Sequence, residues 1–258
     1  MTGDDIRRRW LGNRLLAAVP VAERGLLEPH VQLVELAHRQ VLFEPEEDVV
    51  TTHFPLTGTM AALVVTLEDG KTAEAASIGR EGAIGGIVSA GHKPAFARAV
   101  TVIAGPALRI DTARIELAKG KSTVIRELFE RYADALLAQV LQSVTCNAVH
   151  SQQQRLARWL LMTQDRVGSA DLPLTQETIG EMLGVHRSTV IRVARSLQRQ
   201  GLIRYERGKV AIMDRAGLEQ TVCECYGAVL RHFKRMVPTS KSSRKIVQRR
   251  NGGALLGN

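Results

Sequence analysis

The spacing of apolar side chains changes along the chain and divides it into three regions. Residues 4–27 show an approximately helical spacing that Pro20 interrupts. Residues 30–110 contain short apolar runs separated by turn residues, which is typical of β-strands. From about residue 123 the apolar positions again recur every three or four residues, as in amphipathic helices. The pattern therefore predicts a β domain flanked by helices.

Six strands are predicted in the middle region. Their ranges are 31–36, 41–43, 59–67, 71–78, 97–104 and 107–110. Residues 68–70, Glu-Asp-Gly, join two of them as a hairpin turn does. His53, Phe54 and Pro55 lead into Gly58 and are interpreted as packing. Many short strands with glycine and proline between them indicate a β-sandwich or jelly roll.

Segment 77–82, Ser-Ile-Gly-Arg-Glu-Gly, allows two interpretations. It could form the rim of a pocket. It could equally be a structural turn in which Arg80 and Glu81 pair at the surface.

A long amphipathic helix is predicted from Thr123 to about His150. Its apolar positions keep a spacing of three and four residues and are Ile125, Leu128, Tyr132, Leu136, Val140, Val144 and Ala148. Phe129, Leu137 and Leu141 widen this stripe, so one face suits the β domain and the other suits a partner helix. Because one small domain cannot cover so apolar a helix, we expect a homodimer. The alternative is a helix buried wholly within one chain.

A further helix over 152–166 leads to segment 174–212, where two short helices are predicted. Thr175 is placed to cap the first of them, and Gly184 supplies the left-handed residue at its end. The second short helix is expected over 187–200, followed by a glycine.

The second short helix has two different faces. The face toward the first helix is apolar and carries Val190, Ala194 and Leu197. The other face carries Arg187, Ser188, Ile191, Arg192, Arg195 and Arg199. Strands over 202–205 and 210–213, with a turn at Gly208, would complete a wing. This arrangement lets one helix enter the major groove of DNA. The alternatives are a solvated arginine face and a winged helix that docks a protein.

These residues resemble the Crp/Fnr family of bacterial transcription regulators. The similarity rests on Thr175, Ile179, Gly180, Leu183, Gly184, Arg187, Thr189, Val190, Arg192, Leu197, Gly201, Leu202 and Ile203. It implies an α+β fold with an N-terminal β-roll of the cyclic-nucleotide-binding (jelly-roll) type, a long dimerisation helix and a C-terminal winged helix-turn-helix. The expected segments are an N-terminal helical segment (1–27), the β-roll (28–120), the dimerisation helix (121–150), the winged helix-turn-helix (151–220) and a C-terminal segment with a basic, disordered tail (221–258).

The resemblance also implies which residues bind DNA. Family members often carry Arg-Glu followed four residues later by Arg, and the matching positions here are Arg187, Ser188 and Arg192. Glutamate accepts from a cytosine amino group whereas serine is permissive, so the usual half-site is not carried over. Arg187 and Arg192 are expected to contact base edges, and Ile191 a thymine methyl group. The expected backbone contacts come from Thr175, Gln176, Thr189, Arg195 and Lys209. His186 occupies a position that is commonly Ser or Thr, which weakens the cap and its phosphate contact.

A cyclic nucleotide is not the expected effector. In nucleotide-binding relatives a Gly-Glu pair holds the ribose and an arginine holds the phosphate, because a buried phosphodiester needs a cationic or N–H cradle. Gly86 stands in place of that glutamate and Ala95 in place of that arginine, with Lys93 and Arg98 off register. We therefore predict a retained fold that has lost cyclic-AMP binding, and no cofactor.

Charge supports DNA binding only locally. The chain of 258 residues has a net charge of +9, but residues 225–258 hold eight of the 35 Lys and Arg residues and no acidic residue. Residues 174–212 hold seven basic and three acidic residues, a local excess next to the arginine face. Two roles are open for the tail: it could add salt-sensitive, non-specific affinity for DNA, or it could equally be a solubilising extension.

Composition excludes several other classes. No apolar run reaches 18 residues, so no membrane span is expected, and the N-terminus lacks the apolar core of a signal peptide. A cytoplasmic location is the natural expectation. No nucleophile elbow, phosphate loop or paired-carboxylate motif is present, so an enzyme is not expected.

Three cysteines are too few for a secreted disulfide scaffold. The first is Cys146, which excludes the N-terminal iron–sulfur cluster of some relatives. Cys223 and Cys225, with His232, could bind a metal or respond to oxidation, but two thiols one residue apart are a weak signal. We favour small packed side chains and predict no metal site.

The predicted function is a homodimeric, sequence-specific DNA-binding regulator of the Crp/Fnr type that binds a near-palindromic site. Its partners are double-stranded DNA and a second copy of the chain; RNA polymerase is a further candidate, and a small-molecule effector is not identified. The alternative is a sensor or scaffold whose winged helix docks another protein.

Overall fold

The computed structural model describes residues 3–85 and 94–237 of the chain. The N-terminal helical elements are α1 (Gly3–Trp10), α2 (Arg14–Ala17), η1 (Val21–Leu26) and η2 (Glu28–His30). The strands that follow are β1 (Gln32–Leu36), β2 (Val41–Phe43), β3 (Thr51–Pro55), β4 (Met60–Thr66), β5 (Thr72–Ile78), β6 (Arg98–Ile103) and β7 (Gly105–Asp111). The central helices are α3 (Thr112–Lys121) and α4 (Thr123–Val149). The C-terminal elements are α5 (Gln152–Val167), β8 (Asp171–Leu172), α6 (Gln176–Leu183), α7 (Arg187–Arg199), β9 (Ile203–Glu206), β10 (Lys209–Ile212), α8 (Arg215–Thr221) and α9 (Cys225–Met236).

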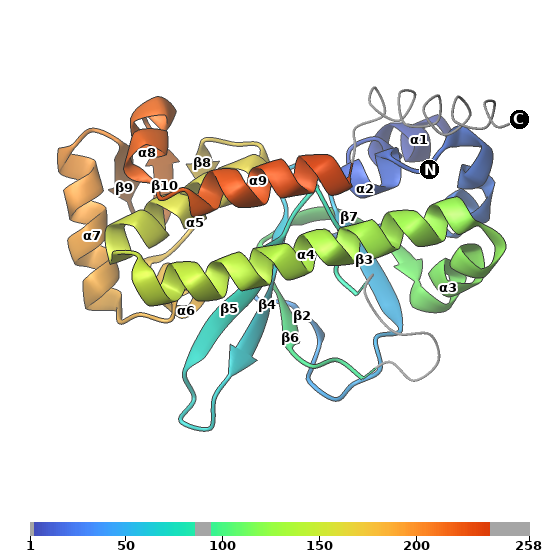
Figure 1. Cartoon of the computed structure of the whole chain (residues 1–258), viewed down its shortest axis with the longest axis horizontal. Coiled ribbons are helices and arrows are strands. Elements are labelled where there is room, and N and C mark those ends of the chain that lie inside the picture. The colour runs from blue at the N-terminus through green and yellow to red at the C-terminus, as the bar shows by residue number, and fades with distance from the viewer. Residues whose placement is uncertain (1–2, 86–93, 238–258) are drawn as a thin grey trace, which may run out of the picture.

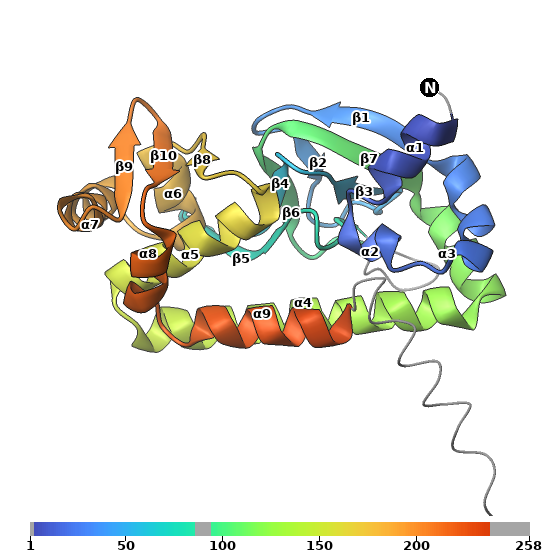
Figure 2. The same ribbon diagram turned by 90° about the horizontal axis from the view of Figure 1, so that it is seen from above.

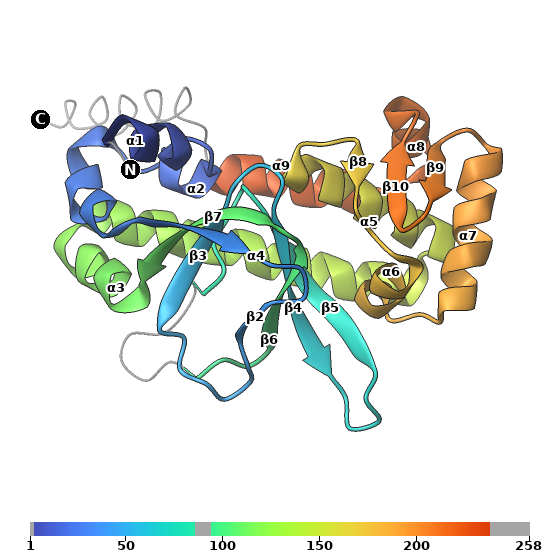
Figure 3. The same ribbon diagram turned by 180° about the vertical axis from the view of Figure 1, so that it is seen from behind.

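Strands β1 to β7 form the predicted β-roll. Within the described residues they make two antiparallel sheets, ordered β1-β7-β3 and β2-β6-β4-β5. The hairpin predicted at residues 68–70 joins β4 to β5, with Thr66 opposite Thr72. The sheets lie along one side of α4 (Figure 3), and Phe54 of β3 packs edge-on against Phe129 of α4. The predicted fold class is confirmed.

Two elements of this region were not predicted. His53, Phe54 and Pro55 belong to strand β3, which pairs along β7 with His53 opposite Arg109. Four of its five residues are buried, so the strand lacks the alternation of apolar and polar positions that reveals a half-buried strand. Helix α3 follows β7 directly and packs on α4.

The long helix α4 is confirmed and runs the length of the molecule. Elements α1 to α3 lie near one end of it and the winged helix near the other (Figure 1). Helix α9 lies alongside α4 (Figure 2), and the rings of Tyr132 and Phe233 meet edge-to-face at 6.5 Å. No helix was expected in the C-terminal segment, and α9 therefore corrects that part of the prediction. Residues 238–258, which contain the expected disordered tail, lie outside the described residues.

One stripe of α4 stays uncovered by either the β-roll or α9. Leu137, Leu141 and Val144 are 57%, 61% and 64% exposed. They follow one another at intervals of four and three residues, so they form a continuous apolar strip on one helix face.

The winged helix packs directly on the β-roll of the same chain. The indole N–H of Trp159 in α5 donates to Glu74 Oε2 in β5 at 2.8 Å. Arg39, between β1 and β2, forms an ion pair with Glu181 of α6 at 2.8 Å. A single apolar core continues across the junction and includes Met60, Val102, Trp159, Leu160, Ile179 and Leu197.

The interpretation of segment 77–82 as a turn with a surface pair between Arg80 and Glu81 is wrong. Glu81 Oε1 instead binds Arg166 Nε of α5 at 2.8 Å, and these side chains are only 14% and 6% exposed. Arg80 Nε donates to the Asp165 carbonyl at 3.2 Å. Helix α5 covers this loop, so both charged side chains turn toward it.

Candidate nucleic-acid interface

The two short helices α6 and α7 are held together by a tight turn. Thr175 caps α6, because its side chain accepts a hydrogen bond from the Thr178 N–H at 3.0 Å. Gly184 ends the helix with φ 62°, a left-handed conformation that favours glycine. A Cβ at Gly180 would lie 2.9 Å from the Val185 carbonyl oxygen, so the chain can cross α6 this closely only at a glycine. Cap, glycine turn and helix limits agree with the sequence prediction.

Helix α7 buries one face and exposes the other. Its buried residues are Val190, Val193, Ala194 and Leu197, of which Val193 was not predicted. The exposed face carries Arg187, Ser188, Arg192, Arg195, Gln198 and Arg199, with Thr189 and Ile191 half-buried beside them. The structure therefore presents the predicted arginines to solvent on one face of α7.

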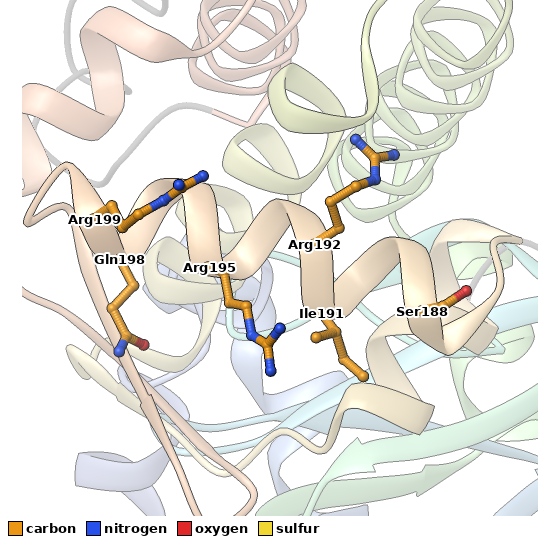
Figure 4. Close-up of a pocket in the computed structure, with 6 residues that line it drawn as sticks. All are labelled: Ser188, Ile191, Arg192, Arg195, Gln198 and Arg199. Carbon is orange, nitrogen blue, oxygen red and sulfur yellow. The ribbon is translucent and has the colours of Figure 1, made fainter.

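A shallow open groove follows this exposed face. It is lined by Ser188, Ile191, Arg192, Arg195, Gln198 and Arg199, all from α7. Figure 4 shows Arg192 and Arg199 leaving the helix on one edge and Ile191, Arg195 and Gln198 on the other. Gln198 was missed by sequence reasoning, although its position three residues after Arg195 places it on the same face.

Arg192 lies at the boundary between two surfaces. It also lines a second groove, together with Ser151, Gln152, Gln153 and Gln154 at the start of α5. Ser196 Oγ donates to Gln153 Oε1 at 3.2 Å across this junction. The start of α5 therefore adjoins the arginine face, which sequence spacing could not show.

Polar contacts orient several of the predicted site residues. Arg187 Nε donates to Gln176 Oε1 at 3.2 Å, which joins the starts of α6 and α7. Lys209 on the wing forms an ion pair with Asp171 at 2.9 Å. Within the described residues, His186 makes no side-chain hydrogen bond that caps α7, as the prediction of a weakened cap expects.

The wing is held against the helices by Tyr205. Its hydroxyl donates to the Leu174 carbonyl at 3.1 Å, and burial raises the pKa of this phenol, opposed by the nearby Arg187. Strands β9 and β10 pair with Lys209 opposite Glu206, and β8 extends the sheet on the side of β10. The wing therefore stands beside the start of α6, on the same side as Arg187.

The positions expected to hold a cyclic nucleotide are only partly described. Ala95 is buried, and its backbone pairs with the loop at Glu46 and Glu47. Arg98 Nε binds Glu44 Oε2 at 2.7 Å, so its charge is already paired. Gly86 and Lys93 lie outside the described residues.

Similarities to known proteins agree with this architecture. A family model for the Crp-like helix-turn-helix domain matches residues 154–221. FixK2 from Bradyrhizobium japonicum superposes with a TM-score of 0.65 at 17% identity, over 75% of this chain and 98% of FixK2. TTHB099, a CRP-family transcriptional regulator from Thermus thermophilus, gives a TM-score of 0.60 at 19% identity, over 73% and 95% of the two chains. The c-di-GMP-responsive global regulator CLP of Xanthomonas campestris gives 0.58 at 15% identity, over 75% and 98%. Among curated protein sequences, none matches this chain.

The fold and the α6–α7 arrangement thus define a winged helix-turn-helix protein with an N-terminal β-roll. Residues 154–221 match the model of the Crp-like helix-turn-helix domain, and the fold of the chain is that of solved regulators of the Crp/Fnr family. In the described part of the chain, no helix combines the length and apolar composition of a membrane span.

Proposed function

We propose that this chain is a homodimeric transcriptional regulator that binds a near-palindromic site in double-stranded DNA. The observation that carries the proposal is the division of α7 into a buried apolar face and an exposed face rich in arginine. Guanidinium groups bind guanine O6 and N7 as well as phosphates, and the major groove admits one α-helix. Helix α7 is therefore the recognition helix of the proposal.

The proposed contacts divide into two kinds. Arg187 and Arg192 contact base edges, Ile191 contacts a thymine methyl group, and Ser188 tolerates several bases. The residues proposed to hold the DNA backbone are Thr175, Gln176, His186, Thr189, Arg195 and Lys209. Thr175 already uses its side-chain oxygen as the cap of α6, so its backbone contact would come from its hydroxyl hydrogen or from main-chain N–H groups of the first turn.

Dimerisation is proposed through α4. The exposed strip of Leu137, Leu141 and Val144 supports it, because a soluble helix rarely leaves such a strip in water. Two chains joined along α4 would place two α7 helices about 34 Å apart, one turn of the DNA duplex. The effector, if one acts, is proposed not to be cyclic AMP, since Ala95 cannot supply the charge that a phosphodiester needs.

Selection from a random pool of DNA duplexes tests the proposal. The full chain is expected to enrich an inverted repeat whose half-site centres are about 10 base pairs apart. The double variant Arg187→Ala/Arg192→Ala is the matched control and should enrich no motif. If the wild-type chain enriches none either, the DNA proposal fails and a protein-docking winged helix is favoured.

A further inference from the structure

Four side chains that commonly bind metal ions meet where α4 ends and α9 begins. They are Cys146, His150, Cys223 and Cys225, and their ligand atoms all lie within 4.8 Å of one another. Cys146 and His150 stand one turn apart near the end of α4. Cys223 and Cys225 lie at the junction of α8 and α9. The fold thus gathers two pairs of ligands that are far apart in the sequence.

The separations between the ligand atoms fit a tetrahedral metal ion. Cys146 Sγ lies 3.7 Å from Cys223 Sγ, and Cys225 Sγ lies 3.5 Å from His150 Nδ1. Zinc at its usual bond lengths would hold two thiolate sulfurs about 3.8 Å apart, and a sulfur and an imidazole nitrogen about 3.5 Å apart. The two observed edges therefore match a ZnCys3His tetrahedron.

The surroundings resemble those of a closed structural site. All three cysteines are buried, and His150 is half-buried. Four protein ligands leave no position open for substrate, as in structural zinc sites. An iron–sulfur cluster would place several iron atoms between its ligands and would hold them farther apart.

Neighbouring polar groups orient two of the ligands. Glu224 Oε2 lies 3.5 Å from His150 Nε2, so this carboxylate can hold the Nε2 proton and leave Nδ1 free to bind metal. Gln142 Nε2 donates to Cys225 Sγ at 3.1 Å, which stabilises negative charge on that sulfur. Carboxylate–histidine and N–H···S contacts of this kind recur around zinc sites.

We propose that Cys146, His150, Cys223 and Cys225 bind one zinc ion per chain and thereby fasten α9 to the end of α4. Zinc is the ion of choice for a thiolate-rich tetrahedron without redox chemistry. The proposal departs from the sequence interpretation in two ways: it gives the packed cysteines a further role as ligands, and it takes His150 rather than His232 as the histidine ligand.

A disulfide switch is the main competing role for these thiols. All three cysteines are buried, and buried thiols are shielded from oxidants in solution. A disulfide between Cys146 and Cys223 would also involve neither Cys225 nor His150, whereas the metal site uses all four side chains.

The proposed zinc site lies next to the start of α5. His150 is the last residue before Ser151, which caps α5 with a reciprocal capping box. Helix α5 is the first helix of the DNA-binding domain, so the proposed zinc lies at the connection between the long helix and that domain. Its binding can be tested without DNA, so the zinc proposal stands or fails apart from the proposed function.

Metal analysis of the full, tag-free chain tests the site. The reduced protein, reconstituted with zinc and passed through a desalting column, should retain about one zinc per chain. Replacement by Co²⁺ should give the intense visible bands of a tetrahedral thiolate site and a near-ultraviolet sulfur-to-cobalt band. Retention near zero, or an octahedral cobalt spectrum, would overturn the proposal.

Matched variants locate the ligands. Cys223→Ser and His150→Ala should lose the tetrahedral cobalt spectrum, whereas His232→Ala, a histidine on the same helix as Cys225, should keep it. Glu224→Gln should bind the metal about 10-fold more weakly, as expected for a group that only orients a ligand. If His150→Ala retains wild-type affinity and spectrum, His150 is not a ligand and the Cys3His site is wrong. A mass lower by two hydrogens in wild-type protein that retains no zinc would establish the disulfide instead.

Discussion

On the exposed face of α7, neighbouring arginines have different tasks in the proposed complex. Gln176 orients Arg187 at the N-terminal end of α7, the end proposed to enter the major groove first. Arg195 lies two turns farther along the same helix. Base contacts carry sequence information and phosphate contacts do not, so the two residues should respond differently to mutation.

We predict that Arg187→Ala weakens binding to the selected site about 10- to 100-fold, equivalent to about 1–3 kcal/mol, and changes binding to random DNA far less. Arg195→Ala, the control on the same helix, should weaken both by the same factor. Titration of labelled duplexes at fixed salt measures the two ratios. An unchanged ratio of specific to random binding in Arg187→Ala would show that Arg187 does not contact bases.

His53 makes the stability of the β-roll depend on pH. Burial first, and the facing charge of Arg109 second, lower the pKa of His53 from 6.5 to about 4. His53 therefore becomes protonated below pH 6.5 in the unfolded chain, but only below about pH 4 in the folded chain. Stability from this residue is complete above pH 6.5 and falls as the pH decreases through that window, by about 3 kcal/mol at most.

A His53→Gln variant tests this dependence, because glutamine cannot ionise. Urea unfolding at pH 7 gives the direct cost of the substitution, and the same measurement at pH 4.5 gives its pH dependence. Wild type should lose about 2–3 kcal/mol more than the variant between the two values. Parallel losses would mean that His53 is protonated equally in both states.

Among the elements, α5 joins the two halves of the chain through a buried ion pair. Arg166 binds Glu81 of the β-roll at 2.8 Å and Gln139 of α4 at 2.6 Å. Three elements thus share one guanidinium group, and loss of its carboxylate partner would leave a buried, uncompensated charge.

We predict that Glu81→Gln lowers the free energy of unfolding by about 3 kcal/mol. Glu130→Gln is the matched control, because Glu130 lies 4.0 Å from Arg126 in a pair whose side chains are 65% and 49% exposed. That control should cost less than about 1 kcal/mol. If Glu81→Gln and Glu130→Gln lower the free energy of urea unfolding equally, the buried ion pair of Glu81 with Arg166 does not join the two halves of the chain.

The elements also differ in how far the sequence revealed them. Helices α6 and α7 were placed within one residue because Thr175, Gly184 and the apolar stripe agree locally. Strand β3 was missed because it is buried on both sides, and α9 because its seven residues after Val229 include three basic ones that resemble a solvated tail. Among the proposed zinc ligands, Cys223 and Cys225 were already candidates in the sequence. Cys146 and His150 were missed because Cys146 and Cys223 are 77 residues apart and only the packing of α9 on α4 joins them.

At the scale of the whole molecule, the uncovered strip of α4 leads to the oligomeric state. We predict that Leu141→Glu converts the proposed dimer to a monomer in sedimentation analysis, because it places a charge in the centre of the proposed apolar contact. The affinity of this variant for the inverted repeat should fall as the dimer is lost, while its binding to a single half-site should persist.

Leu117→Glu on α3 is the control for this substitution. Leu117 is 56% exposed, close to the 61% of Leu141, but it lies away from the proposed interface. Its variant should remain dimeric. If Leu141→Glu also sediments as a dimer, α4 does not hold the two chains together.

The contact between Trp159 and Glu74 has an optical consequence. The chain contains two tryptophans. Of these, only Trp159 spans the junction of the winged helix with the β-roll, whereas Trp10 is buried in a separate apolar core with Leu15 and Phe54. If the winged helix swings away from the β-roll, the indole of Trp159 enters water and its fluorescence emission shifts to the red. A Trp10→Phe chain would therefore carry Trp159 as its one tryptophan fluorophore. Any ligand that moves the winged helix could then be detected by the shift in Trp159 emission before the chemical nature of the ligand is known.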